Sequence, residues 1–244
     1  MSNTYFQFKQ FIIHQDRCAM KVTTDACLFG AWTTEQIKNE KLIITNCLDI
    51  GTGTGLLPLL LSQKISALNF DAVEIDKDSF EQAKENIAAS PWAGRIKVIH
   101  ADARDLSSEN KYAIIISNPP FYENELKGDN KKKNIAHHSD DLSLSELLKI
   151  IKNNLSTDGT FYLLLPYKRN EEIKKLIRET GLFIQQIIFV RQSVNHDFSR
   201  FMIAGKLKAD ESNETMINEI TIRDEEQQYT DGFKNLLRDY YLHL

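Results

Sequence analysis

Between residues 42 and 207, short apolar and β-branched runs alternate with longer amphipathic runs. The short runs predict strands, and the longer runs, in which apolar residues recur at helical spacing, predict helices. The predicted strands are residues 42–50, 70–75, 96–99, 112–117, 160–165, 183–190 and 201–207. The predicted helices are residues 56–64, 78–89, 144–155 and 171–179, the last of which Gly181 can close.

Alternating strands and helices predict an α/β fold, a doubly wound and mostly parallel sheet covered by helices on both faces. The run Ile114–Ile116 indicates a strand that is buried on both faces. Residues 183–190 and 201–207 have no helix between them, so we expect a C-terminal antiparallel hairpin at one edge of the sheet. We expect a single domain with three parts, residues 1–40 packed onto the core, a core of residues 41–208, and a C-terminal appendage of residues 209–244.

A glycine-rich loop, Gly51-Thr52-Gly53-Thr54-Gly55, separates the first predicted strand from its helix. Glycines let the backbone turn sharply and approach a ligand closely at the carboxyl end of a strand. The G-x-G-x-G spacing differs from the G-x-G-x-x-G of dinucleotide sites, and Asp49 stands just before it. A carboxylate there repels a pyrophosphate but suits the cationic sulfonium and ammonium of S-adenosylmethionine. The loop therefore predicts an S-adenosylmethionine site, and a turn that binds nothing is the alternative.

Two more acidic residues follow strands of the same sheet. Glu74 ends the second strand, about 20 residues after the loop, where its carboxylate can accept hydrogen bonds from both ribose hydroxyls. Asp102 follows the third strand, beside Ala103, and can accept a hydrogen bond from the adenine amine of the cofactor. Taken alone, Asp102 fits a helix cap or a solvated loop better than a cofactor contact. As the third acidic residue in this series, it is predicted to contact the cofactor.

The fourth strand leads directly into Ser117-Asn118-Pro119-Pro120-Phe121-Tyr122. Two consecutive prolines fix the backbone and remove two N–H donors, which leaves rigid carbonyls at the edge of the sheet. An amine conjugated to a planar ring is a poor nucleophile. The Asn118 side-chain oxygen and the Pro119 carbonyl can each accept one N–H, which localises the lone pair and stabilises positive charge on nitrogen. We predict four catalytic residues, Asn118, Pro119, Pro120 and Phe121, with Phe121 or Tyr122 stacking on an extruded base; a plain proline turn is the alternative.

Together these motifs resemble those of class I methyltransferases that carry an N-P-P-[FYW] sequence and act on amines of adenine, guanine or glutamine. The ends of the chain add to the resemblance, because they are similar to those of the bacterial tRNA1(Val) (adenine(37)-N6)-methyltransferase family. The segments that carry this similarity are residues 8–15, 20–25 and 28–32 at the N-terminus and residues 220–223, 229–230 and 240–242 at the C-terminus.

The resemblance implies a Rossmann-like class I methyltransferase fold, S-adenosylmethionine as cofactor, and methylation of N6 of an adenine in tRNA, by resemblance adenine 37 of tRNA1(Val). It also implies that residues 21–25 close over the methionine end of the cofactor, where the residues alone predict the N-cap of a short helix. The predicted cofactor-binding residues are then Lys21, Thr24, Asp49, Gly51, Gly53, Gly55, Glu74, Asp102, Ala103 and Asn118. Residues 134–138 (Asn-Ile-Ala-His-His) stand where the family is expected to carry Ala-Arg-His, and we assign His137 and His138 no catalytic role.

The formal net charge of −4, with a pI of about 5.9, excludes a basic surface spread over the whole molecule. Contacts with RNA phosphates must therefore come from a local patch. The predicted RNA-binding residues are Lys127, Lys131, Lys132 and Lys133 after the catalytic motif and Lys168 and Arg169 after the fifth strand. A solvated loop is an equally good interpretation of Lys131–Lys133.

The remaining composition predicts a cytoplasmic enzyme without a metal. Three cysteines, Cys18, Cys27 and Cys47, have no metal-ligand spacing and suit a reducing compartment. We expect no membrane partner, since there is neither a secretion signal nor an apolar run near the roughly 20 residues that span a bilayer. The sequence leaves the oligomeric state open.

Three other functions use similar chemistry or the same fold. A guanine N2-methyltransferase of ribosomal RNA also acts on a conjugated amine, and the chemistry alone does not distinguish it. A protein glutamine N5-methyltransferase usually carries a helical N-terminal domain, for which the segment before residue 41 leaves no room. A non-catalytic partner subunit that binds S-adenosylmethionine would have no need of Asn118 and Pro119, which argues against it.

Overall fold

A computed structural model of the chain describes residues 3–40, 44–106, 111–120, 142–209 and 214–244. The strands in this part of the chain are β1 (Tyr5–Gln7), β2 (Ile12–His14), β3 (Asn46–Ile50), β4 (Asn69–Glu74), β5 (Ile96–His100), β6 (Tyr112–Ser117), β7 (Leu155–Pro166), β8 (Phe183–Ser193), β9 (Phe198–Lys206) and β10 (Met216–Arg223). The α-helices are α1 (Thr24–Asn39), α2 (Leu56–Ser62), α3 (Lys77–Ala88), α4 (Leu144–Asn154), α5 (Asn170–Thr180) and α6 (Asp231–Leu237). Short 3-10 helices are η1 (Ala93–Arg95), η2 (Ala103–Asp105) and η3 (Tyr167–Arg169).

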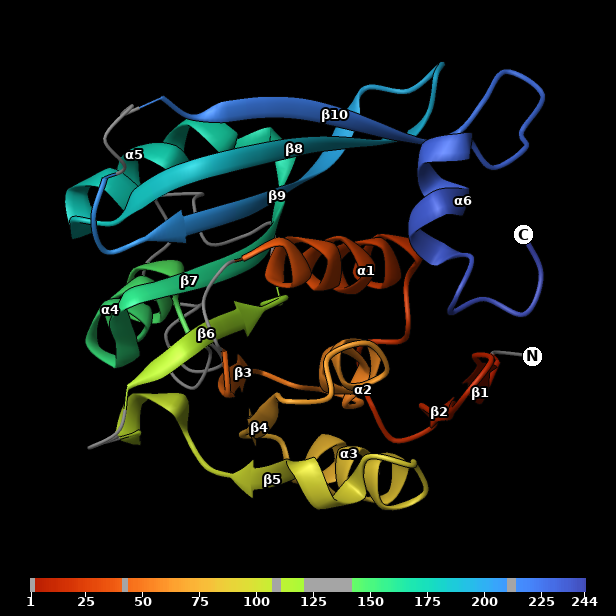
Figure 1. The fold of residues 1–244 in the computed structure, drawn as a ribbon, viewed down its shortest axis with the longest axis horizontal. Coiled ribbons are helices and arrows are strands. Elements are labelled where there is room, and N and C mark those ends of the chain that lie inside the picture. Colours follow the sequence, from red (N-terminus) through yellow and green to blue (C-terminus); the bar gives the residue numbers. More distant parts are fainter. Residues whose placement is uncertain (1–2, 41–43, 107–110, 121–141, 210–213) are drawn as a thin grey trace, which may run out of the picture.

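Eight strands form one sheet in the order β10-β8-β9-β7-β6-β3-β4-β5 (Figure 1). Every neighbouring pair is parallel except the two pairs that include β9, so β9 alone runs against the other seven strands. The predicted doubly wound, mostly parallel sheet is confirmed. Because the strand order changes direction at β3, the carboxyl ends of β3, β4 and β6 meet at a topological switch point, where α/β sheets bind ligands.

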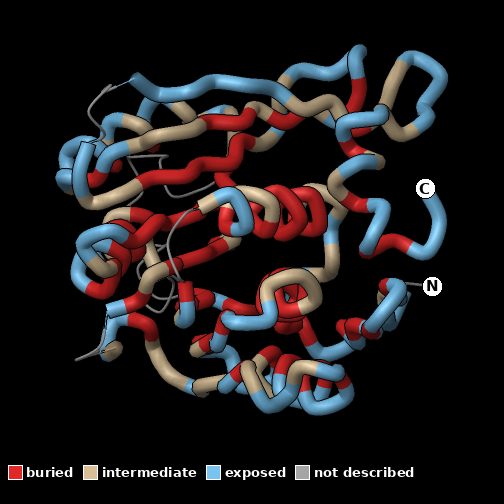
Figure 2. The backbone as a smooth tube through the Cα atoms, in the orientation of Figure 1, coloured by how far each residue is buried: buried red, intermediate tan, exposed pale blue. Residues whose placement is uncertain are grey.

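The predicted antiparallel hairpin is confirmed as β8 and β9, but it does not form the outermost edge. Instead, β9 lies between β7 and β8, and β10 pairs in parallel with β8 beyond them. Residues 216–223 of the expected C-terminal appendage thus extend the sheet. The sequence did not predict this strand, because the first half of β10 is exposed, only Ile222 is buried, and the strand lacks the apolar run of a buried strand (Figure 2).

Helices cover both faces of the sheet. Helices α1, α2, α3 and α6 share one apolar cluster with the sheet, and α4 and α5 share the other. Consecutive residues of β6 alternate between the clusters, since Ile114 and Ile116 face the first and Ile115 the second. All three are fully buried, which confirms the prediction that this strand is covered on both faces.

Helix α1 begins as the sequence predicts, with Thr23 as its N-cap, whose hydroxyl accepts the N–H of Ala26 at 3.4 Å. The expectation of a short helix was wrong, because α1 continues for 16 residues. Its length follows from packing, since the helix is buried along most of residues 26–34. Gly30 allows this close approach, because a Cβ atom there would lie 2.5 Å from Leu60 Cδ1 of α2.

The two ends of the described chain pack together. The β1–β2 hairpin meets the C-terminal segment through a bridge between Phe8 and Tyr241, and Lys9 N–H donates to the carbonyl of Tyr240 at 2.8 Å. The same hairpin is attached to α3, because Asn86 both accepts the N–H of His14 and donates to its carbonyl, each at 2.9 Å. No helix in the described part of the chain is long and apolar enough to cross a membrane.

The insertion of β9 between β7 and β8 depends on a small residue at Gly205. A Cβ atom there would lie 2.4 Å from the Phe161 ring and 2.7 Å from the carbonyl oxygen of Phe183. We expect Gly205→Ala to lower the free energy of unfolding by about 1–3 kcal/mol, the usual cost of overpacking. Urea unfolding followed by circular dichroism measures the change.

Gly232 provides the matched control, because it lies in α6 and a Cβ atom added there would have no neighbour within 4 Å. Gly232→Ala should leave the stability unchanged or raise it by up to about 1 kcal/mol, since alanine favours the helix. Equal stability of the Gly205→Ala protein and the unsubstituted protein would contradict the packing argument.

Candidate active site

The glycine loop after β3 is held by the end of β4. Gly51 and Thr52 donate their N–H groups to the carbonyl of Val73 at 2.9 and 3.0 Å. Gly53 donates its N–H to Oε2 of Glu74 at 2.8 Å. The loop glycines have positive φ, and at Gly53 φ is +56°, a conformation that side chains with a Cβ rarely adopt. The loop therefore depends on glycine and on its contacts with β4.

Glu74 is buried, and both of its carboxylate oxygens are engaged. Oε2 accepts the N–H of Gly53, and Oε1 accepts the N–H of Asp76 at 3.0 Å. A carboxylate has about four acceptor positions, so each oxygen can accept one further hydrogen bond. This geometry suits a pair of neighbouring hydroxyls that donate to the two oxygens of one carboxylate.

Asp49 lies in β3, directly behind the loop, and is fully buried. Neither of its carboxylate oxygens has a hydrogen-bond partner among the described residues. Burial raises the pKa of Asp49 to about 7; the nearby Thr52 hydroxyl opposes this rise, and the negative charge of Glu74 adds to it. A buried carboxylate without a partner is costly unless a positive charge approaches it.

The catalytic motif continues directly from β6. The Ser117 hydroxyl, fully buried, donates to the carbonyl of Ile50 at 2.7 Å and so joins the end of β6 to the end of β3. Asn118 follows and is half-buried, Pro119 is buried, and Pro120 is exposed. The Asn118–Pro120 turn is thereby fixed next to the glycine loop.

These elements surround a cavity of about 520 Å³, within the usual range of small-molecule sites. Nine predicted site residues line it, which are Lys21, Gly51, Gly53, Glu74, Asp102, Ala103, Asn118, Pro119 and Pro120. Three other predicted cofactor-binding residues do not line the cavity. Thr24 starts α1, Asp49 lies beneath the loop, and Gly55 is the N-cap of α2. Gly55 serves packing, because its Cβ would lie 3.2 Å from Ile87 of α3.

Part of the cavity wall, residues 18–20 and Ile75, was not predicted from the sequence, whereas Lys21 and Val22 belong to the predicted segment 21–25. Residues 18–22 line it, held there by Gln15, whose Oε1 accepts the N–H of Val22 at 2.8 Å. Ile75 and Met20 also line it and are unusually exposed for apolar residues, 50% and 45%. A signal for Ile75 was present, because an apolar residue directly after Glu74 stands at the ligand-binding end of the strand. Apolar surface of this kind suits a flat ring.

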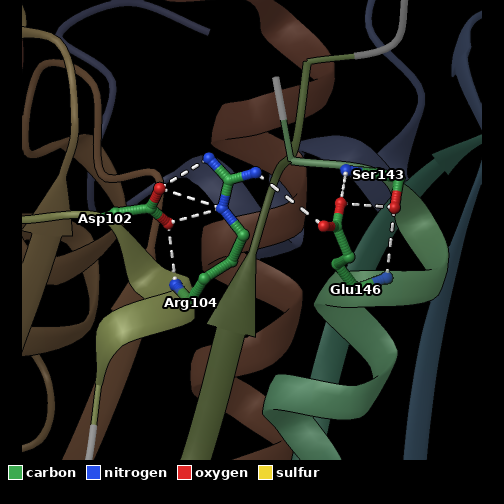
Figure 3. A network of polar contacts seen from close by, with 4 residues as sticks. All are labelled: Asp102, Arg104, Ser143 and Glu146. Atoms are coloured by element: carbon green, nitrogen blue, oxygen red, sulfur yellow. Dashed lines mark hydrogen bonds and ion pairs between the residues drawn. The ribbon is translucent and has the colours of Figure 1, made fainter. Parts of the chain in front are cut away.

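Asp102 takes part in a polar network that the sequence did not predict (Figure 3). It is the N-cap of η2, and its carboxylate accepts hydrogen bonds from the backbone N–H of Arg104 at 2.8 Å and from the guanidinium at 2.6–3.0 Å. These bonds hold the pKa of Asp102 below its usual value. Arg104 also lies 3.8 Å from Glu146, which forms a capping box with Ser143 at the start of α4. Asp102 is thus both the helix cap and a wall of the cavity.

The predicted RNA-binding residues fall into two groups. Lys168 and Arg169 lie in η3, just after β7, and Arg169 forms an ion pair with Glu172 at 3.0 Å. The others, together with one predicted catalytic residue and both histidines, lie outside the described residues, and these are Phe121, Lys127, Lys131, Lys132, Lys133, His137 and His138. In the described part of the chain, no group of three His, Cys, Asp or Glu side chains could hold a metal ion.

A model of the methyltransferase small domain family matches residues 34–178. The tRNA1(Val) (adenine(37)-N6)-methyltransferase of Bacteroides fragilis is 39% identical over 246 residues and covers 99% of each chain. That of Christiangramia forsetii is 37% identical over 100% of each chain. The chain belongs to the tRNA1(Val) (adenine(37)-N6)-methyltransferase family. The resemblance expected from the motifs and the two terminal segments is confirmed.

Solved structures confirm the methyltransferase fold. A protein described as a predicted O-methyltransferase from Agrobacterium tumefaciens superposes with a TM-score of 0.63 over 87% of this chain and 95% of its own. Its sequence is only 12% identical, so the likeness concerns the Rossmann-like class I fold alone.

The cavity of this methyltransferase fits S-adenosylmethionine, the cofactor of its family. Glu74 has acceptor capacity left for two hydroxyls, and the unpaired carboxylate of Asp49 favours a cation at the loop. The exposed apolar side chain of Ile75 offers a surface for a purine ring. These acceptor groups and the apolar surface suit the cofactor. The roles of the individual residues stay predictions.

The raised pKa of Asp49 predicts that cofactor affinity depends on pH. The positive charge of the cofactor is attracted by the ionised carboxylate of Asp49 and not by the protonated one. Because the pKa of Asp49 is about 7, only about a tenth of the protein has this carboxylate ionised at pH 6. We expect the affinity for S-adenosylmethionine, measured by calorimetry, to fall about tenfold from pH 8 to pH 6. Asp49→Asn should bind more weakly at pH 8 and lose most of the pH dependence.

Without the cofactor, the same carboxylate lowers stability as the pH rises. Its folded-state pKa lies above the unfolded value, so the stability gained by protonation is lost as the pH passes about 7. Asp49→Asn should therefore resist urea better than the unsubstituted protein at pH 8. Asp158→Asn, at an exposed aspartate, is the control. A pH-independent cofactor affinity of the unsubstituted protein would rule out this role of Asp49.

Proposed function

We propose that the chain transfers the methyl group of S-adenosylmethionine to N6 of adenine 37 in tRNA1(Val). One observation carries the proposal: the Asn118–Pro119 turn borders the same cavity as the glycine loop and Glu74. The two full-length relatives named for this reaction, at 39% and 37% identity, support the substrate. A substrate of this kind accords with a cytoplasmic enzyme.

When bound, S-adenosylmethionine supplies an electrophilic methyl group on a positively charged sulfur. Glu74 would accept hydrogen bonds from the ribose hydroxyls, and Asp102 from the adenine amine. Lys21 and the rest of the N-terminal segment would close over the methionine end. Asp49 would stabilise the positive charge through the loop, since it precedes Gly51–Gly53 in the chain and its carboxylate has no hydrogen-bond partner among the described residues.

Asn118 and Pro119 prepare the amine of the target adenine. The Asn118 side-chain oxygen and the Pro119 carbonyl would each accept one N–H, which turns the nitrogen lone pair toward the methyl group. Both acceptors also stabilise the positive charge that develops on nitrogen during the transfer. The amine becomes acidic only after it carries the methyl group, so its proton can pass to water without a dedicated base.

The rigidity of this turn supports its role. The bond from Ser117 to Ile50 fixes the end of β6, and Pro119 and Pro120 restrict the backbone that follows. Acceptors held in place before the reaction require no reorganisation during it, which is the main source of electrostatic catalysis. Phe121, outside the described residues, is proposed to stack on the target base.

Lys168 and Arg169 are proposed to contact the tRNA backbone. They follow β7, the strand next to β6, so they lie at the same edge of the sheet as Asn118. Lysine and arginine at such a position neutralise phosphates without reading sequence. Lys127, Lys131, Lys132 and Lys133 remain candidates for the same role on the basis of the sequence alone.

Substitution of Asn118 tests the proposed mechanism. We expect Asn118→Ala to lower methyl transfer to tRNA1(Val) by about 100-fold or more, because one of two charge-stabilising acceptors is lost. Transfer is measured with radiolabelled S-adenosylmethionine and tRNA from cells that lack this gene, followed by nucleoside analysis for N6-methyladenosine. Binding of S-adenosylhomocysteine should remain within a few-fold of the unsubstituted protein.

Asn153→Ala is the matched control, because Asn153 is exposed at the end of α4, next to the start of β7 and away from the carboxyl ends of the strands. It should methylate tRNA normally. Label in N2-methylguanosine of ribosomal RNA, or in a protein, and none in tRNA would disprove the substrate. An Asn118→Ala protein with normal activity would disprove the mechanism.

A further inference from the structure

Strands β7, β9 and β8 extend past the point where β6 ends. Ser117, the last residue of β6, lies opposite Leu163, whereas β7 continues to Pro166. The neighbouring β9 pairs with it to the end, with Arg200 opposite Pro166. At about 3.3 Å per residue, β7 projects roughly 10 Å beyond Ser117. The ends of these three neighbouring strands, visible side by side in Figure 1, therefore project beyond the end of β6, next to Asn118.

Three aromatic side chains lie together at these projecting strand ends. The ring of Tyr167 lies 5.3 Å from that of Phe189 and 5.2 Å from that of Phe198, and Phe189 and Phe198 are 5.3 Å apart. All three are half-buried, so part of each ring remains accessible to solvent. The fully buried Phe201 supports them from below, 6.3 Å from Phe189. We call Tyr167, Phe189 and Phe198 the aromatic wall.

Arginines border the aromatic wall, but carboxylates balance their charges. Arg191 lies over the ring of Phe198 at 4.3 Å and also pairs with Glu219 at 2.5 Å. Arg200 pairs with Asp25 at 3.0 Å. These two ion pairs balance the charges of Arg191 and Arg200, and the phosphate contacts proposed for Lys168 and Arg169 lie beside the wall. The chemistry of this surface therefore favours flat, apolar ring faces over a strongly anionic ligand.

The position of the aromatic wall indicates which rings it would meet. The cavity is lined by residues at the carboxyl ends of β3, β4, β5 and β6 and by the N-terminal segment, and Asn118–Pro120 are among its lining residues. The wall lies on the other side of Asn118, on η3 at the end of β7 and on β8 and β9. When a nucleotide brings its base from solvent to Asn118, the nucleotides next to it in the RNA chain lie beside the wall. Unpaired bases offer π faces that stack on aromatic side chains.

We infer that the aromatic wall binds one or two unpaired bases next to the target adenine and so forms the docking surface for the RNA loop. This inference rests on the proposed function and deepens it. The wall holds the bases that flank the target by stacking, and the Asn118–Pro119 turn receives the target itself. Because stacking accepts every base, the surface contributes affinity and orientation more than sequence readout.

Substitutions that remove a ring but keep an apolar side chain test the wall. We expect Tyr167→Leu and Phe198→Leu each to weaken binding of tRNA1(Val) by about fivefold to 100-fold, as loss of one base-stacking contact does. Fluorescence anisotropy of labelled tRNA measures the dissociation constant. The KM for tRNA should rise, and the affinity for S-adenosylhomocysteine and the thermal midpoint should stay unchanged.

Two further variants separate stacking from general packing. Tyr167→Phe keeps the ring and should bind tRNA like the unsubstituted protein. Phe183→Leu removes an exposed ring, 41% accessible, at the opposite end of β8, and should have no effect. If a leucine variant is unstable, ultraviolet crosslinking of the unsubstituted protein with tRNA, read by mass spectrometry, should place nucleotide adducts on Tyr167 or Phe198.

The failures of the two proposals are distinguishable. Normal tRNA affinity of the Tyr167→Leu and Phe198→Leu proteins, with methylation of adenine intact, would overturn the aromatic wall and leave the function standing. An equal loss of affinity in Phe183→Leu would also overturn it, because the effect would then not be local. If the unsubstituted protein neither binds nor methylates tRNA, the proposed function and the inference both fail.

Discussion

The hydrogen bond from the Ser117 hydroxyl to the Ile50 carbonyl, 2.7 Å long and fully buried, determines how the two halves of the site meet. Ile50 is the last residue before the glycine loop, and Ser117 is the last before Asn118. Breaking the bond would leave a buried donor and acceptor without partners, which costs about 1–3 kcal/mol for each group. The bond therefore keeps the ends of β3 and β6 in register. The cofactor loop and the turn that is proposed to accept the amine become neighbours as a consequence of the sheet itself.

Asp49 shows that the site is maintained at the expense of stability. Its pKa of about 7, against a usual value of 3.8, corresponds to an unfavourable contribution on the order of 4 kcal/mol when it is ionised. A methyltransferase tolerates this cost if the charge is needed for a cationic ligand, since binding then recovers part of it. Glu74 behaves differently, because the N–H groups of Gly53 and Asp76 stabilise its charge before any ligand binds. The two carboxylates thus divide their roles, one favouring a cation and the other fixing the loop.

The sequence predicted the features that depend on local order along the chain. The glycine loop, Glu74 and Asn118 each follow a strand, and parallel strands bring such ends to one edge. It did not predict features that depend on contacts between distant residues. Gln15 holds the N-terminal segment over the cavity through a hydrogen bond with Val22, and neither residue type signals this contact. The sequence did not predict strand β10 for another reason. The strand pairs with β8 through its backbone, and only one of its residues, Ile222, is buried.

An acidic protein that acts on RNA cannot rely on its net charge for affinity, so it needs a local basic patch or contacts that do not depend on charge. The net charge of −4 makes long-range attraction to phosphates weak, and the ion pairs of Arg191 and Arg200 neutralise cations close to the site. Stacking on aromatic rings acts only at contact and is little affected by the total charge. A flat aromatic surface beside Asn118 is compatible with this charge balance, whereas a broad basic groove is not. The electrostatics of the molecule and the geometry of its sheet are therefore both compatible with the proposed stacking of RNA bases beside Asn118.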